Sequence, residues 1–112
     1  MEKNIRLSLL LDFYGSMLTD KKREIMTLYV ELDTSLSEIA TELNTTRQSV
    51  YDAVKVSMND LENFEKKLKC VEKYISNREI ILESINLLKE NFGDNETTRE
   101  VIKKLEQVLK NQ

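Results

Sequence analysis

Histidine, proline and tryptophan are absent from this 112-residue sequence, and glycine occurs only twice. Because histidine is the commonest general base and a common metal ligand, its absence argues against a metal-dependent or acid–base enzyme. The sequence also contains no nucleophile motif and no phosphate-binding loop, so we expect no catalytic residues, no metal site and no cofactor. The lack of proline, together with abundant Glu, Lys, Leu and Ile, favours long helices over sheet. The sequence therefore predicts an all-α protein.

Cysteine and positive charge are also scarce. Cys70 is the only cysteine and has no partner for an internal disulfide, so nothing indicates an oxidising compartment. The formal net charge of -3 counts against a protein that binds mainly through phosphate contacts. The apolar segment 5–18 is interrupted by Asp12 and is too short to span a bilayer. We expect a core helix there, in a cytoplasmic protein that does not insert into membranes.

Residues 35–56 have the pattern of a helix-turn-helix. Ser35 and Glu38 form a capping box at the start of the first helix. Asn44 stands at the turn, where a left-handed backbone is expected, and Thr45 or Thr46 caps the second helix. Helical spacing points one set of apolar side chains inward: Ile39, Ala40, Leu43, Val50 and Val54.

The same spacing leaves polar side chains on the outer face of the second motif helix, where a recognition helix contacts a nucleic-acid groove. These residues are Arg47, Gln48, Ser49, Tyr51, Asp52 and Lys55. A second basic group, Lys21, Lys22 and Arg23, lies upstream. It could contribute phosphate contacts beside the motif or simply form a solvated polar face, and the sequence leaves both interpretations open.

Two helices are predicted before the motif. The first covers residues 3–14 and ends at Gly15, whereas the second covers residues 20–31 and is capped by Thr19. The apolar residues of the second helix form a stripe that we expect to be buried: Ile25, Met26, Leu28, Tyr29 and Leu32.

No glycine or proline ends the second motif helix before Gly93. Its inward positions repeat with a seven-residue period: Val50, Val54, Ser57, Leu61, Phe64, Leu68, Val71 and Ile75. We predict that this helix continues to a capping box at Ser76 and Glu79. We expect this row of inward residues to pack against another element, either the C-terminal helices of the same chain or a second copy of the chain. The second possibility predicts a homodimer through part of the row: Leu61, Phe64, Leu68, Val71 and Ile75.

The C-terminal part is predicted to be an antiparallel helical pair around a polar turn at residues 91–95. Thr97 and Glu100 offer a further capping box at the start of the last helix. We expect a single helical domain over residues 1–112. Its helix-turn-helix part covers residues 1–68, and a C-terminal helical extension covers residues 69–112.

Two family resemblances follow from these motifs. The segment 19–68 resembles region four of bacterial sigma factors, the module that reads promoter DNA. The chain resembles the YlxM family of small bacterial helix-turn-helix proteins more strongly, over roughly its first two thirds. Three runs carry that resemblance: residues 11–19 (LDFYGSMLT), 36–40 (LSEIA) and 47–52 (RQSVYD). The resemblance to YlxM implies association with the signal recognition particle, through its RNA or its GTPase.

Three functions are consistent with this sequence. The first is a non-catalytic adaptor that binds nucleic acid in the signal recognition particle pathway. Arg47, Gln48, Ser49, Tyr51 and Lys55 would contact the nucleic acid, with Lys21, Lys22 and Arg23 in support. The second is a DNA-binding transcriptional regulator, although the acidic balance predicts weak duplex binding. The third is a protein-interaction module that keeps the motif as a scaffold.

Overall fold

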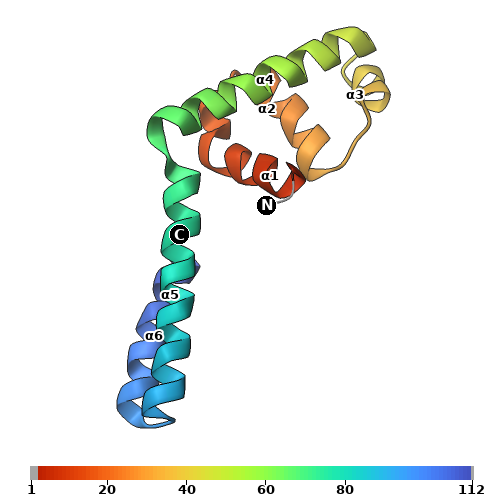
Figure 1. The fold of residues 1–112 in the computed structure, drawn as a ribbon. Coiled ribbons are helices and arrows are strands. Elements are labelled where there is room, and N and C mark those ends of the chain that lie inside the picture. Colours follow the sequence, from red (N-terminus) through yellow and green to blue (C-terminus); the bar gives the residue numbers. More distant parts are fainter. Residues whose placement is uncertain (1–2, 112) are drawn as a thin grey trace. The chain divides into compact units, whose positions relative to one another are not determined.

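All elements assigned in residues 3–111, the part of the chain that the computed structural model describes, are helical, which confirms the all-α prediction (Figure 1). The chain divides into two compact units: unit 1, Met1–Val71, and unit 2, Glu72–Gln112. The boundary predicted from the sequence, after Leu68, lies three residues before the observed boundary after Val71.

The first helices of unit 1 begin and end where local chemistry places them. Helix α1 (Lys3–Tyr14) ends in a 3₁₀ turn, η1 (Gly15–Met17), at a position where a Cβ on Gly15 would lie 3.2 Å from Leu11 Cδ1. Helix α2 (Asp20–Met26) starts at Thr19, whose hydroxyl accepts a hydrogen bond from the Lys22 N–H. Both predicted boundaries are confirmed.

Helix α2 continues into a π-helical turn, η2 (Thr27–Glu31). Leu32, which follows it, is 65% exposed, so its predicted burial is wrong. A π-helical turn rotates less per residue than an α-helix, so η2 carries Leu32 off the helical stripe before the chain turns at Asp33, where φ is 51°.

The helix-turn-helix consists of α3 (Leu36–Glu42) and α4 (Arg47–Leu68). Ser35 caps α3 by accepting a hydrogen bond from the Glu38 N–H, and Thr46 caps α4 by accepting one from the Ser49 N–H. Asn44 adopts the predicted left-handed conformation, with φ 54°. The turn therefore has the local geometry that the sequence predicts.

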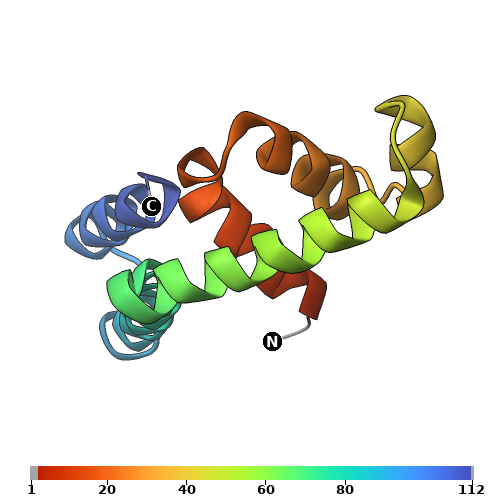
Figure 2. The same ribbon diagram turned by 90° about the horizontal axis from the view of Figure 1, so that it is seen from above.

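Helix α4 packs against α1, α2 and α3 of the same unit (Figure 2). Four members of its seven-residue row are buried there: Val50, Val54, Ser57 and Leu61. The sequence predicts that the C-terminal helices or a second copy of the chain pack against this part of the row. Both predictions are wrong for these four residues, because α1, α2 and α3 already pack there. Val71 is also fully buried, whereas Leu68 is 47% exposed. Of the five residues predicted for a homodimer, only Phe64, Leu68 and Ile75 keep exposed surface.

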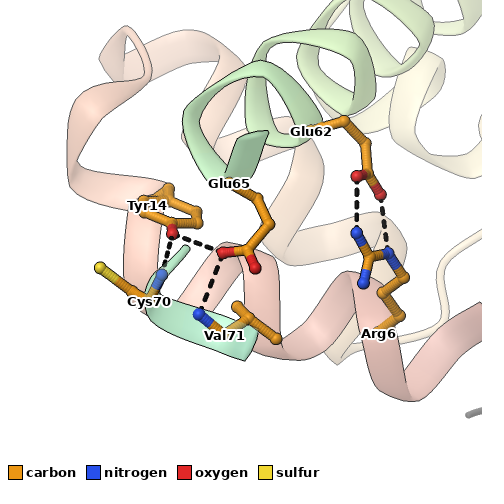
Figure 3. A network of polar contacts seen from close by, with 6 residues as sticks. All are labelled: Arg6, Tyr14, Glu62, Glu65, Cys70 and Val71. Carbon is orange, nitrogen blue, oxygen red and sulfur yellow. Dashed lines mark hydrogen bonds and ion pairs between the residues drawn. The ribbon is translucent and has the colours of Figure 1, made fainter. Parts of the chain in front are cut away.

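The long helix breaks at Lys69, which has a left-handed φ of 57°, and not at the predicted Ser76. Helix α5 (Cys70–Phe92) then runs through the unused capping box at residues 76–79. The break falls at Lys69 because two side chains, one of them distant in sequence, accept hydrogen bonds from the first N–H groups of α5. The Cys70 N–H donates to the Tyr14 hydroxyl, and the Val71 N–H donates to the Glu65 carboxylate (Figure 3).

Unit 2 is a helical hairpin in which α6 (Glu96–Asn111) returns antiparallel beside α5, as predicted (Figures 1 and 2). Gly93, with φ 66°, makes the turn. Asn95 caps α6 by accepting from the Thr98 N–H, so the capping box predicted at Thr97 is wrong. Asn95 precedes Thr97 and lies directly before α6, so its side chain is the one that reaches the free N–H groups of the helix. No helix in residues 3–111 is long and apolar enough to cross a membrane.

Candidate nucleic-acid interface

The candidate interface lies on the first three turns of α4. Its six predicted residues are all exposed, and together they form what we call the reading surface: Arg47, Gln48, Ser49, Tyr51, Asp52 and Lys55. Val50 and Val54, on the opposite side of the same turns, are buried against the rest of unit 1. The reading surface is therefore held on a helix whose orientation is fixed by its core contacts, which is the requirement for a recognition helix.

Two contacts order side chains within the reading surface. The Gln48 amide donates to the Asp52 carboxylate at 3.0 Å. The Lys55 ammonium lies 5.7 Å from the centroid of the Tyr51 ring, within the range of a cation–π interaction. Arg47 forms no ion pair within residues 3–111, so its guanidinium is available to a ligand.

The reading surface carries little net charge, because Asp52 offsets one of the two cations, Arg47 and Lys55. A shallow groove of about 650 Å³ runs along the same side of α4. Its lining combines apolar Val56 and Met58 with polar and charged residues: Asp52, Lys55, Asn59 and Glu62. Such a surface offers stacking, hydrogen bonds and apolar contact in place of a strong positive field.

The second predicted basic group is not brought to the reading surface. Lys22 forms an ion pair with Asp60 at 3.3 Å. Asp60 follows Tyr51 by nine residues, which at about 100° per residue places the two side chains on opposite sides of α4. Asp60 is also about 20 Å along the helix from Arg47. Lys21 and Arg23 are exposed on α2. The structure therefore separates two groups that the sequence treats as one candidate site.

An ion pair that sequence reasoning missed borders the groove. The Arg6 guanidinium donates two hydrogen bonds to the Glu62 carboxylate, at 2.9 and 2.7 Å (Figure 3). The bond to Glu62 raises the pKa of Arg6, and burial opposes that shift. The pair joins α1 to α4 across 56 positions of sequence, and no local pattern indicates such a partner.

A family model described as "Putative helix-turn-helix protein, YlxM / p13 like" (UPF0122) matches residues 1–108. The chain belongs to the UPF0122 family. A UPF0122 protein of Clostridium acetobutylicum is 43% identical over 102 residues, which cover 88% of both chains. Those of Bacillus mycoides and Bacillus cereus (strain AH187) are 38% and 37% identical over 108 residues, which cover 96% of this chain and 98% of theirs.

These matches confirm the resemblance to the YlxM family. They also extend it beyond the first two thirds of the chain, since the UPF0122 match includes α5 and most of α6. Membership in a helix-turn-helix family supports a nucleic-acid-binding role. The similarity to sigma factor region four stays a prediction.

Proposed function

We propose that this chain is a non-catalytic, cytoplasmic adaptor that binds the RNA of the signal recognition particle through the reading surface. One observation carries the nucleic-acid part of the proposal. Arg47, Gln48, Tyr51 and Lys55 are exposed together at the start of a helix that the rest of unit 1 holds in place. The choice of the signal recognition particle rests on the resemblance to the YlxM family.

The chemistry of the reading surface favours unpaired RNA over a long duplex. Tyr51 is 43% exposed, so its ring can stack on an unpaired base, a contact worth about 1–3 kcal/mol. Lys55 is already positioned over that ring, and Arg47 can add a phosphate or base-edge contact. Because Asp52 cancels one positive charge, we expect modest affinity with a small salt dependence.

The GTPase of the particle is the second candidate partner. The groove beside Lys55 exposes Val56, which is 47% exposed, and partly exposes Met58. An apolar side chain of a protein could bind there while RNA contacts Arg47 and Tyr51. A joint RNA and protein contact would compensate for the weak charge of the reading surface.

A DNA-binding transcriptional regulator is the alternative function. The arrangement of α3, a left-handed turn and α4 is the one that places a recognition helix in the major groove. A regulator of this kind would recognise a duplex with sequence selectivity, and this property distinguishes it from the adaptor.

The test compares binding to the RNA of the particle and to random duplex DNA by mobility shift at two salt concentrations. We expect the RNA to bind. We also expect Arg47→Ala and Tyr51→Ala each to weaken RNA binding about tenfold, equivalent to about 1.4 kcal/mol. Arg78→Ala is the control, because Arg78 is an exposed arginine of α5 outside the reading surface.

Two outcomes would overturn this proposal. Sequence-selective duplex binding without RNA binding would support the regulator. Capture of the GTPase from lysate that persists after RNase treatment and is unaffected by Arg47→Ala would support a protein partner alone.

A further inference from the structure

Unit 2 buries few apolar side chains for its number of apolar residues. Within the described part of unit 2, the buried residues are Ile85, Thr98 and Ile102, which are 6–8% exposed. Several large apolar residues of α5 and α6 remain more than one third exposed: Ile80, Leu82, Leu87, Phe92, Val101 and Val108. A hairpin of about 40 residues cannot form a sufficient core by itself, and such units are commonly stabilised by association.

Four of these six residues, Ile80, Leu87, Val101 and Val108, lie on one side of the hairpin. Ile85 of α5 and Ile102 of α6 are buried and mark the line along which the two helices meet. In an antiparallel pair, positions at equal offsets from these two residues lie on the same side. One side of α5 therefore carries Ser84, one residue before Ile85, and Leu88, three residues after it. The same side of α6 carries Val101 and Leu105, at the same offsets from Ile102.

This side, which we call the uncharged face, has no Asp, Glu, Lys or Arg at its central positions. Lys104 lies at the same offset from Ile102 as Leu87 does from Ile85, so these two residues mark the edge of the face. On α5 it consists of Asn77, Ile80, Ile81, Ser84, Leu87, Leu88 and Asn91, and on α6 of Val101, Leu105 and Val108. Asn77, Ser84 and Asn91 recur every seven residues, with Ile80 and Leu87 between them. These positions have the spacing of a coiled-coil seam, with apolar residues at one of its two repeating positions and small or amide side chains at the other.

The other side of the hairpin is charged. Lys89, Arg99 and Glu106 line a cavity of about 360 Å³ there, together with Asp94. Leu82 lies at the same offset from Ile85 as Arg99 does from Ile102, so it belongs to this charged side. The hairpin thus has two chemically different faces, and the uncharged one has the greater apolar exposure.

We propose that the uncharged face binds the same face of a second copy of this chain, so that two hairpins form a four-helix bundle. The partner surface must itself lack charge, because a charged group buried against this face would have no counter-ion. The uncharged face meets that requirement when it pairs with itself around a two-fold axis. With eight acidic and seven basic residues, unit 2 also carries almost no net charge to repel its copy.

The size of the face is sufficient for a specific dimer. Helix α6 has 16 residues and is therefore about 24 Å long, and two adjacent helices are about 20 Å wide. Each copy would cover about 500 Å², and the pair about 1,000 Å², which is where specific interfaces begin. This interface differs from the seven-residue row, in which Leu61 of α4 and Val71 of α5 are buried within the chain.

The test is the mass of the full chain in solution, measured by light scattering and sedimentation at tens of micromolar. We expect the wild type to have twice the chain mass of 13.1 kDa. Leu87→Glu places a charge on the uncharged face and should halve the apparent mass, and Val108→Glu should do the same from α6. Leu82→Glu is the matched control: an exposed leucine of the same helix on the charged side, which should leave the dimer unchanged. Circular dichroism checks that each variant keeps its helix content.

Several results would overturn the proposal. A monomeric wild type would show that no second copy binds. A dimer that survives both Leu87→Glu and Val108→Glu would place the interface elsewhere. Loss of the dimer in Leu82→Glu as well would remove the distinction between the two faces. A dimer lost only in Leu68→Lys would assign the interface to the exposed end of the α4 row.

Discussion

The Tyr14 hydroxyl donates a 2.6 Å hydrogen bond to the Glu65 carboxylate, although the two residues lie 51 positions apart (Figure 3). The same two groups accept the Cys70 and Val71 N–H groups at 2.9 and 3.0 Å. A helix start leaves such N–H groups without an intrahelical partner, and a side chain just before the helix normally takes them. Here a tyrosine of α1 and a glutamate of α4 cap α5, and so fix the residue at which it begins.

Removal of this hydroxyl should destabilise unit 1. Tyr14→Phe keeps the buried ring and its contact with Phe64 but deletes one donor to Glu65 and the acceptor of the Cys70 N–H. We expect a loss of about 2–3 kcal/mol in the free energy of unfolding, measured by urea denaturation. Tyr51→Phe is the control because Tyr51 is exposed, and it should change stability by less than about 0.5 kcal/mol. An equal loss in both variants would contradict the structural role of the Tyr14 hydroxyl.

Stability should also depend on the ionisation of Tyr14 at high pH. Burial, followed by the bond to Glu65, raises the pKa of Tyr14 above its ordinary value of 10.0. Because the folded state holds this proton more tightly than the unfolded state, the contribution is fully present below about pH 10. It is lost as the pH rises further, when the unfolded chain ionises first. The stability gap between wild type and Tyr14→Phe should therefore be constant from pH 7 to 9 and narrow above pH 10. A gap that stays constant to pH 11 would contradict it.

Where the helices start could be predicted when the signal is local. Thr19, Ser35 and Thr46 cap the helices that directly follow them, and Asn44 turns the chain as its side chain predicts. The break at Lys69 could not be predicted because its cause lies in Tyr14 and Glu65. The capping pattern at Ser76 is misleading for the converse reason. A serine three residues before a glutamate arises readily in a Glu-rich helix and has no effect when tertiary contacts continue that helix.

Replacement of Lys69 should reveal the strain at this break. A left-handed conformation costs an L-residue about 1–2 kcal/mol, which glycine avoids at the expense of a more flexible unfolded chain. We expect Lys69→Gly to raise the free energy of unfolding by about 0.5–1 kcal/mol. Lys67→Gly is the matched control in the last turn of α4, and we expect a loss of about 1 kcal/mol there. The same sign in both variants would contradict the assigned backbone geometry.

Ser57 is a weak point in the apolar row of α4. Its side chain is fully buried, and its hydroxyl has no hydrogen-bond partner in the described part of the chain. Ser57→Ala removes that unpaired group and adds helix propensity, so we expect a gain of about 1–2 kcal/mol by urea denaturation. Ser76→Ala, at an exposed position of α5, changes propensity alone and should gain less than about 0.5 kcal/mol. Equal gains would mean that the Ser57 hydroxyl is satisfied in solution.

The exposure of the reading surface could be predicted from the sequence. The separation of the basic group of α2 from that surface could not. Helical periodicity separates Tyr51 and Lys55 from Val50 and Val54, and the structure agrees. Periodicity does not reveal how α2 lies against α4, because that arrangement depends on packing between helices. That packing brings Lys22 to Asp60 and so places one member of the upstream basic group on the far side of α4.

That separation gives a prediction about the form of the nucleic acid. A duplex that accepts α4 in its groove has a backbone on each side of the helix and can contact both basic groups. An unpaired loop that stacks on Tyr51 contacts one side alone. For the RNA of the signal recognition particle, we therefore expect Lys21→Ala and Arg23→Ala to weaken binding less than twofold, against about tenfold for Arg47→Ala, measured by fluorescence anisotropy. Comparable losses in all three variants, with a steeper salt dependence in the wild type than in each, would instead support a duplex lying across both flanks of α4.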